Sequence, residues 1–168
     1  MNLLVTGGAG FIGSHLVRRL VIDSGHRVVN LDALRYSGNR ANTRDLDGNP
    51  RYQFVHGDIA DQALVRRLLE EHRIDSVINA AAETHVDRSI LDPANFAKTD
   101  VVGTGVLLEE ARRAGVKRFV QVSTDEVYGS VETGSSTEAD ALVPRSPYSA
   151  SKAGGDLLSL SFWTTYRF

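Results

Sequence analysis

The sequence contains no cysteine, a single tryptophan and no excess of either charge. Without cysteine there is neither a disulfide nor a thiolate metal site, and we expect no metal, as fits a reducing compartment. The 19 basic and 21 acidic residues give a net charge of -2, which favours neither nucleic acid nor a membrane surface as partner. No apolar run approaches the roughly 20 residues of a membrane span, and no signal peptide precedes residue 6. We therefore expect a cytoplasmic protein.

Short β-branched runs alternate with longer stretches of helical periodicity along the 168 residues. This alternation is typical of βαβ units, whose strands form a parallel sheet covered by helices. The expected strands are residues 3–5, 27–31, 52–55, 76–79 and 118–122. The expected helices are one that carries Ile12, Leu16 and Leu20, one that begins after the N-cap Asp61, and residues 93–114 and 147–168. Residues 33–50 and 129–146 are expected to be loops.

We therefore predict an α/β fold, a Rossmann-like doubly wound parallel sheet, with residues 1–168 in one domain. In the strand order 3-2-1-4-5-6, residues 118–122 would form an edge, and folds normally cover such an edge. The pattern thus indicates a fold that is truncated after its fifth strand.

A glycine-rich segment, residues 6–13, joins the first strand to the first helix. It contains Gly7, Gly10 and Gly13, and also the Gly-x-Gly-x-x-Gly spacing that starts at Gly8. Glycine lets a backbone turn tightly and approach a pyrophosphate, which the N–H groups of a helix N-terminus can bind. A flexible turn would show the same glycines, but the place between strand and helix favours a dinucleotide site.

Asp32 ends the second strand, where a carboxylate accepts hydrogen bonds from ribose hydroxyls and repels a 2′-phosphate. This favours NAD over NADP. Arg35 argues for NADP, and we interpret it instead as a solvated loop residue. Asp58 and Ile59 are candidates to flank the adenine, although Asp58 could simply serve the next helix. Residues 80–82, all alanine, either keep the cofactor face clear or pack a helix on the sheet.

Tyr148 and Lys152 lie one helical turn apart and so share a helix face. An ammonium beside the phenol should bring the tyrosine pKa from about 10 towards the working pH. Tyr148 could then remove an alcohol proton during oxidation. The same spacing also occurs by chance in many helices.

Asp125 and Glu126 follow the fifth strand, at the edge where open α/β sheets bind ligands. Such a pair is often a solvated acidic turn, but two carboxylates in different environments can also act as acid and base. Thr124 can hydrogen-bond the oxygen that is oxidised. For His85 and Asp87 we favour a pocket or structural role over proton transfer.

These motifs resemble the extended short-chain dehydrogenase/reductases and, within them, the dTDP-glucose 4,6-dehydratases. The resemblance rests on residues 4–15, 81–89, 102–104, 123–129 and 147–152. Its specific part is the triplet Thr124, Asp125 and Glu126, because the related 4-epimerases lack the acidic pair. The triplet also favours dTDP-glucose over GDP-mannose as substrate.

The resemblance implies that Tyr148, supported by Lys152, deprotonates the sugar 4-hydroxyl while NAD takes the C4 hydride. Glu126 would then remove the C5 proton, Asp125 would protonate the departing 6-hydroxyl, and hydride would return to C6. Thr84 and Thr124 would touch the sugar. The residues implied at the cofactor are Gly7, Gly10, Phe11, Ile12, Gly13, Asp32, Asp58, Ile59, Ala80, Ala82, Thr99, Tyr148 and Lys152.

The chain departs from the family pattern in three ways. Asp100 stands where the family usually has asparagine, so that a turn hydrogen bond is expected to be disturbed. Gly154 and Gly155 lie inside the last helix, where glycine costs roughly 1 kcal/mol each. The family's C-terminal substrate domain is absent. The alternatives are therefore a dehydratase for another nucleotide sugar, an inactive NAD-binding fragment, or an interaction module. Family members pair through two helices, here residues 93–114 and 147–168, so a homodimer is expected.

Overall fold

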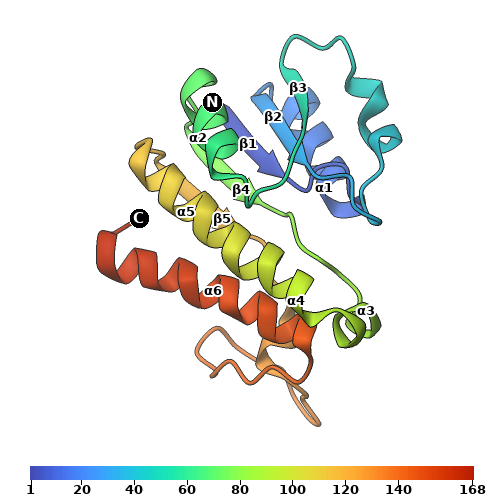
Figure 1. The fold of residues 1–168 in the computed structure, drawn as a ribbon, viewed down its shortest axis with the longest axis vertical. Coiled ribbons are helices and arrows are strands. Elements are labelled where there is room, and N and C mark those ends of the chain that lie inside the picture. The colour runs from blue at the N-terminus through green and yellow to red at the C-terminus, as the bar shows by residue number, and fades with distance from the viewer.

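Five parallel strands form the central sheet of the computed structural model, which describes residues 1–168. The strands are β1 (Asn2–Thr6), β2 (Arg27–Asp32), β3 (Tyr52–His56), β4 (Ser76–Asn79) and β5 (Arg118–Gln121). They lie in the order β3-β2-β1-β4-β5, and every neighbouring pair is parallel (Figure 1). The five predicted strands and the Rossmann-like α/β class are confirmed.

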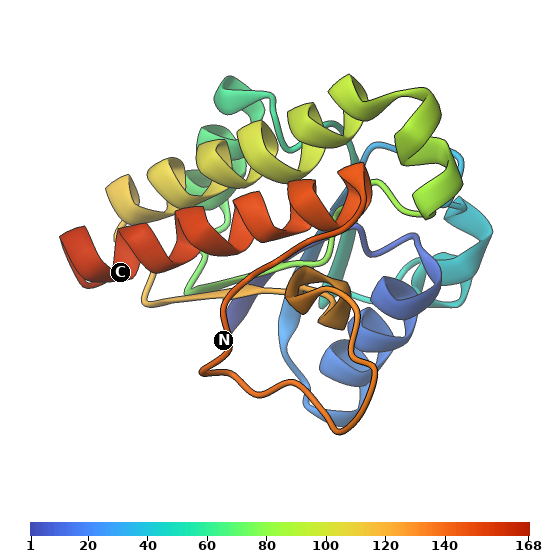
Figure 2. The ribbon, with the colours of Figure 1, turned by 90° about the horizontal axis from the view of Figure 1, so that it is seen from below.

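Helices cover both faces of this sheet (Figure 2). The α-helices are α1 (Phe11–Arg18), α2 (Gln62–Glu71), α3 (Val86–Leu91), α4 (Pro93–Phe96), α5 (Thr104–Arg113) and α6 (Pro147–Tyr166). The π-helices are η1 (Arg19–Asp23) and η3 (Ala97–Gly103), and the 3₁₀ helices are η2 (Arg40–Leu46) and η4 (Asp125–Tyr128). The expected helix over 93–114 is thus α4, η3 and α5 in direct succession, and the expected loop over 33–50 contains η2.

Two apolar cores lie on opposite faces of the sheet, because successive strand residues point to opposite sides. Leu4 packs with residues of α2 and α5, whereas Leu3 and Val5 pack with residues of α1 and η1. The predicted N-cap of α2 is confirmed, since Asp61 accepts a hydrogen bond from the Leu64 N–H at 3.0 Å. The long helix α6 runs beside α5 (Figures 1 and 2). No helix has the length and apolar character needed to cross a membrane.

Two glycines of α6 face η3 at close range. A Cβ on Gly154 would lie 2.8 Å from Val101 Cγ2, and one on Gly155 would lie 2.9 Å from the Asp100 carbonyl oxygen. A backbone oxygen cannot swing aside as the end of a side chain can. The missing side chain at position 155 therefore lets α6 pack closely against η3, which offsets the lower helix propensity of glycine.

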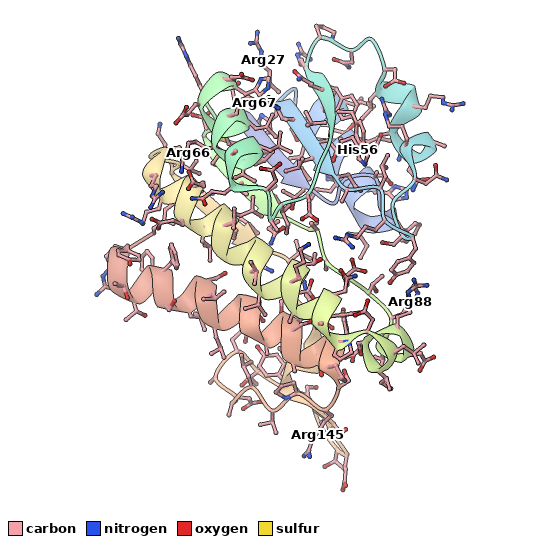
Figure 3. All side chains as sticks on the ribbon, viewed as in Figure 1. Arg27, His56, Arg66, Arg67, Arg88 and Arg145 are labelled. Carbon is pink, nitrogen blue, oxygen red and sulfur yellow. The ribbon has the colours of Figure 1, made fainter.

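A buried carboxylate joins α2 to α5. The Glu110 side chain is 1% exposed and accepts hydrogen bonds from Gln62 Nε2 at 2.7 Å and from Arg66 Nε at 2.8 Å. Arg66 extends from α2 (Figure 3). Chiefly because of the Arg66 hydrogen bond, and against the effect of burial, the pKa of Glu110 falls from 4.5 to about 2.

Replacing Gly155 by alanine should destabilise the fold by about 1–3 kcal/mol, the usual range for overpacking, although alanine favours helix by about 1 kcal/mol. Gly105→Ala in α5 is the matched control, because its Cβ would meet only Leu158 Cδ1, at 3.8 Å. The control should be neutral or stabilising. Urea unfolding followed by circular dichroism measures both, and equal stabilisation of the two variants would contradict the close packing at Gly155.

Glu110 should make the stability of the fold depend on acid pH. Because its pKa is lowered in the folded state, its contribution is present above about pH 4.5 and is lost as the pH falls towards 2. In the Glu110→Gln variant, the free energy of unfolding should fall less between about pH 4.5 and about pH 2 than it does in the parent. Glu109→Gln, whose side chain is 29% exposed, should alter the profile less. If the free energy of unfolding depended on pH identically in the two variants, Glu110 would not be the cause of the acid dependence.

Candidate functional site

A cleft with a volume of about 400 Å³ opens at the carboxyl ends of the strands, where open α/β sheets bind ligands. Its wall includes all the residues predicted for the cofactor: Gly7, Gly10, Phe11, Ile12, Gly13, Asp32, Asp58, Ile59, Ala80, Ala82, Thr99, Tyr148 and Lys152. Thr84 lines the same cleft, whereas Thr124, Asp125 and Glu126 lie outside this lining. The structure thus brings the predicted residues together; their roles stay predictions.

The glycine loop is fixed by contacts that leave no room for side chains. Gly7 has a φ of +70°, and a Cβ there would lie 2.6 Å from the backbone nitrogen of Ala81. The Gly7 N–H donates to the Leu31 carbonyl at 2.9 Å, so the loop is tied to β2. Gly10 is the N-cap of α1 and provides no side-chain cap, which leaves the first N–H groups of the helix for an anion.

Asp32 is held in place by the glycine loop and by the loop that follows β2. Its Oδ2 accepts from the Ala9 N–H at 2.8 Å, and its Oδ1 accepts from the Leu34 N–H at 2.7 Å. The residue is 7% exposed. Each carboxylate oxygen can accept a further bond, so the group is positioned to bind ribose hydroxyls.

Arg35 lies in the loop after β2 and its side chain is 36% exposed, as interpreted, but it is also held by polar partners that the sequence did not indicate. Its guanidinium donates to Asp58 Oδ2 at 3.0 Å and to Asn95 Oδ1 at 3.1 Å, and it pairs with Glu83 Oε1 at 3.3 Å. Burial acts to raise the pKa of Asp58, but the N–H of Ala60 and the Arg35 guanidinium outweigh it, so that this pKa is lowered. With two carboxylates as partners, the Arg35 charge is already balanced and gives no support to an NADP site.

Tyr148 and Lys152 project from the first two turns of α6, which begins at Pro147 with a capping box between Ser146 and Ser149. Lys152 is 4% exposed, and its Nζ donates to the Val122 carbonyl at 2.7 Å. Burial lowers the pKa of Lys152, while Asp100 and Asp156 oppose this effect.

The prediction that the pKa of Tyr148 lies below its usual value is wrong for this structure. Burial raises the pKa of Tyr148 and the carboxylates of Glu126, Asp100 and Asp125 add to this, with only the Thr124 hydroxyl opposing. The sequence spacing gives the shared helix face but not the burial, which arises from residues far along the chain.

The acidic pair lies on η4, a short helix that packs against α6, the helix of Tyr148. Thr124 caps this short helix, because its Oγ1 accepts from the Glu126 N–H at 3.3 Å. Asp125 and Glu126 are exposed and form no ion pair. Both charges act to raise the pKa of Tyr148, although a solvated acidic turn would also be exposed.

Sequence reasoning missed Tyr36, which supports the segment that carries Thr84. The Tyr36 hydroxyl donates to the Thr84 carbonyl, accepts from the Thr84 N–H at 3.2 Å, and lies 3.1 Å from His85 Nδ1. The guanidinium of Arg88, seen beside α3 in Figure 3, lies 3.6 Å from the centre of the Tyr36 ring. His85 has a φ of +71°, so these bonds hold a strained backbone. No pattern in the sequence indicates this contact.

The cleft fits a dinucleotide on observations of the structure itself. The helix N-terminus is uncapped, Asp32 is oriented by two N–H groups, and Thr99, one of the lining residues, has a buried hydroxyl without a hydrogen-bond partner. These groups offer donors to a diphosphate and acceptors to a ribose.

The relatives of the chain include several dTDP-glucose 4,6-dehydratases. The family model described as GDP-mannose 4,6 dehydratase matches residues 4–168. The low-salt glycan biosynthesis protein Agl12 of Haloferax volcanii is 51% identical over 99% of this chain and 53% of its own length. A dTDP-glucose 4,6-dehydratase of Streptomyces griseus is 56% identical over 95% of this chain and 49% of its own. The chain spans about half the length of the curated relatives it matches.

Solved structures show the same similarity as the sequences. DesIV, a dTDP-glucose 4,6-dehydratase from Streptomyces venezuelae whose structure contains NAD, superposes with a TM-score of 0.96 and 52% identity, covering 100% of this chain and 53% of DesIV. A UDP-glucose 4-epimerase from Thermus thermophilus, also with NAD, has a TM-score of 0.90 and 36% identity over 100% of this chain and 52% of its own. The chain belongs to the GDP-mannose 4,6 dehydratase family, and its predicted resemblance to the dTDP-glucose 4,6-dehydratases is confirmed.

Proposed function

We propose that residues 1–168 form an NAD-binding domain that carries the catalytic groups of a dTDP-glucose 4,6-dehydratase. The observation that carries the proposal is the cleft itself. Tyr148 and Lys152 line the same cavity as the glycine loop and Asp32, and η4, which carries the acidic pair, packs against α6. The product would be dTDP-4-dehydro-6-deoxyglucose.

In this proposal NAD, when bound, supplies the hydride acceptor for C4 and later the donor for C6. The glycine loop and the first turn of α1 hold the diphosphate, and Asp32 binds the ribose of the adenosine. Asp58 and Ile59 flank the adenine, and Thr99 donates its free hydroxyl. The balanced charge of Arg35 supports NAD rather than NADP.

Tyr148 removes the proton of the sugar 4-hydroxyl, while Thr124 hydrogen-bonds the same oxygen. Because burial and nearby carboxylates raise the pKa of Tyr148, its ionisation needs a cation, and Lys152 provides one on the same helix face. The Val122 carbonyl fixes the Lys152 ammonium at 2.7 Å.

The acidic pair performs the elimination in this proposal. Once C4 is a ketone the C5 proton becomes acidic, and Glu126 removes it. Asp125 protonates the departing 6-hydroxyl, which leaves as water. Thr84, held by Tyr36, contacts the sugar.

An apolar helix face supports the proposal of a homodimer. Leu157, Leu160 and Trp163 of α6 are 57%, 58% and 56% exposed, and α6 lies beside α5. Pairing of these two helices with a second copy would bury this face. The cytoplasmic location also stays a prediction.

The NAD site is tested by Asp32→Asn. Loss of the carboxylate should weaken NAD⁺ binding about tenfold or more, as expected for charge-assisted bonds of about 1.5–3 kcal/mol. The difference in affinity between NAD⁺ and NADP⁺ should also become smaller. Calorimetric titration of each cofactor measures this. Asp23→Asn, at the end of η1 and away from the cleft, is the control. Equal NAD⁺ affinity in the parent and in Asp32→Asn would refute the assignment of the ribose site.

The reaction is tested by incubating the chain with NAD⁺ and dTDP-glucose and analysing the products by mass spectrometry. The parent should release the sugar nucleotide less one water. The variant with Asp125→Asn and Glu126→Gln should yield at most the 4-keto sugar without loss of water, and Tyr148→Phe should yield neither.

Other outcomes distinguish the remaining alternatives. Product from GDP-mannose rather than dTDP-glucose would assign another nucleotide sugar. A folded parent chain that binds NAD⁺ but converts neither sugar would be a cofactor-binding fragment, and the proposed reaction of this chain would be wrong.

A further inference from the structure

A buried carboxylate that the proposed mechanism does not use lies at the contact between η3 and α6. Asp100 is 2% exposed. Its Oδ1 accepts from the Glu83 N–H at 3.1 Å, and its Oδ2 accepts from the Ser151 hydroxyl at 2.6 Å. The expected disturbance of a hydrogen bond at this turn is therefore not seen, because both carboxylate oxygens have donors.

Two of the three departures of the chain from its family pattern, Asp100 and the glycine pair of α6, meet at this point. A side chain at Gly155 would collide with the backbone carbonyl of Asp100, and one at Gly154 would collide with the neighbouring Val101. Helix α6 therefore lies close enough to η3 for Ser151 to reach the Asp100 carboxylate. Ser151 stands between Tyr148 and Lys152, so the bond fixes the turn of α6 that carries both.

Few neighbouring groups stabilise the positive charge of the buried Lys152 ammonium. It is 4% exposed, its Nζ bonds a single protein acceptor, the Val122 carbonyl, and it forms no direct ion pair. A buried ammonium is stable only with opposite charge or hydrogen bonds around it. Asp100 is the stronger of the two carboxylates that favour the charged form, and Asp156 is the other.

We propose that Asp100 is a positioning residue for the catalytic turn of α6. Its carboxylate holds Ser151, the residue before Lys152, against the segment after β4, and provides a buried negative charge to compensate the buried Lys152 ammonium. This goes beyond the proposed function, and its significance for catalysis depends on that function.

The surrounding charged groups do not replace Asp100. On α6, Asp156 is only half-buried, whereas Asp100 is 2% exposed, so solvent screens the charge of Asp156 more. Tyr148 is neutral because its pKa is raised. Glu83, after β4, is paired with Arg35. On η4, Asp125 and Glu126 are exposed to solvent, which screens their charge.

The experiment follows the side-chain nitrogens of the chain labelled with ¹⁵N-lysine, by NMR across pH. The lysines are Lys98, Lys117 and Lys152, so Lys98 and Lys117 serve as internal references. Asp100→Asn keeps the size of the side chain and removes its charge. It should lower the titration midpoint of Lys152 by about one pH unit or more, as expected for loss of a nearby opposite charge, and leave the other lysines unchanged.

Two variants separate charge from structure. Ser151→Ala removes the hydrogen bond to Asp100 but keeps the Asp100 carboxylate. It should therefore shift the titration midpoint of Lys152 less than Asp100→Asn does. Asp156→Asn should also have the smaller effect. A Lys152 midpoint in Asp100→Asn equal to that of the parent would overturn the proposal, as would an equal shift in Ser151→Ala.

A second measurement decides the matter if Asp100→Asn fails to fold. In Asp156→Asn, the Lys152 nitrogen should still show an inflection on the acid side, where the Asp100 carboxyl titrates above its usual range because of burial. Absence of that inflection would overturn the proposal. Since the readout is the titration of an amine, the result is independent of whether the chain converts dTDP-glucose.

Discussion

The catalytic side of the cleft depends on the packing of α6 against η3, because α6 alone carries Tyr148 and Lys152. Glycine at position 155 permits the close approach to the Asp100 backbone. Ser151 then bonds the Asp100 side chain, and Lys152 bonds the carbonyl that follows β5. Any change that moved α6 outwards would break these bonds together and withdraw both catalytic candidates from the cavity.

The cofactor side of the cleft could be predicted in large part from the sequence. Parallel strands end at one edge of their sheet, so residues that follow β1, β2, β3 and β4 must converge there. The glycine loop was recognisable in the sequence because its backbone positions require glycine. At Gly7, backbone atoms occupy the space that a Cβ would need. The N-cap Asp61 was recognisable for a similar reason, since capping is a local interaction.

Features that depend on contacts between distant residues could not be predicted. The partners of Arg35 come from three other segments, at Asp58, Glu83 and Asn95. The π-helical turn η3 interrupts what the periodicity shows as one helix. The pKa of Tyr148 depends on burial and on carboxylates from η3 and η4, whereas helical spacing reports only that Lys152 lies one turn away.

The two halves of the proposed reaction are electrostatically coupled through Tyr148. The acidic pair that elimination requires also raises the pKa of the phenol that oxidation requires. In the proposed reaction, both acidic side chains must reach the sugar at C5 and at the 6-hydroxyl, so their charges cannot be moved away from the phenol. The cation that offsets them in this proposal is the Lys152 ammonium, which the Val122 carbonyl fixes at 2.7 Å on the same face of α6.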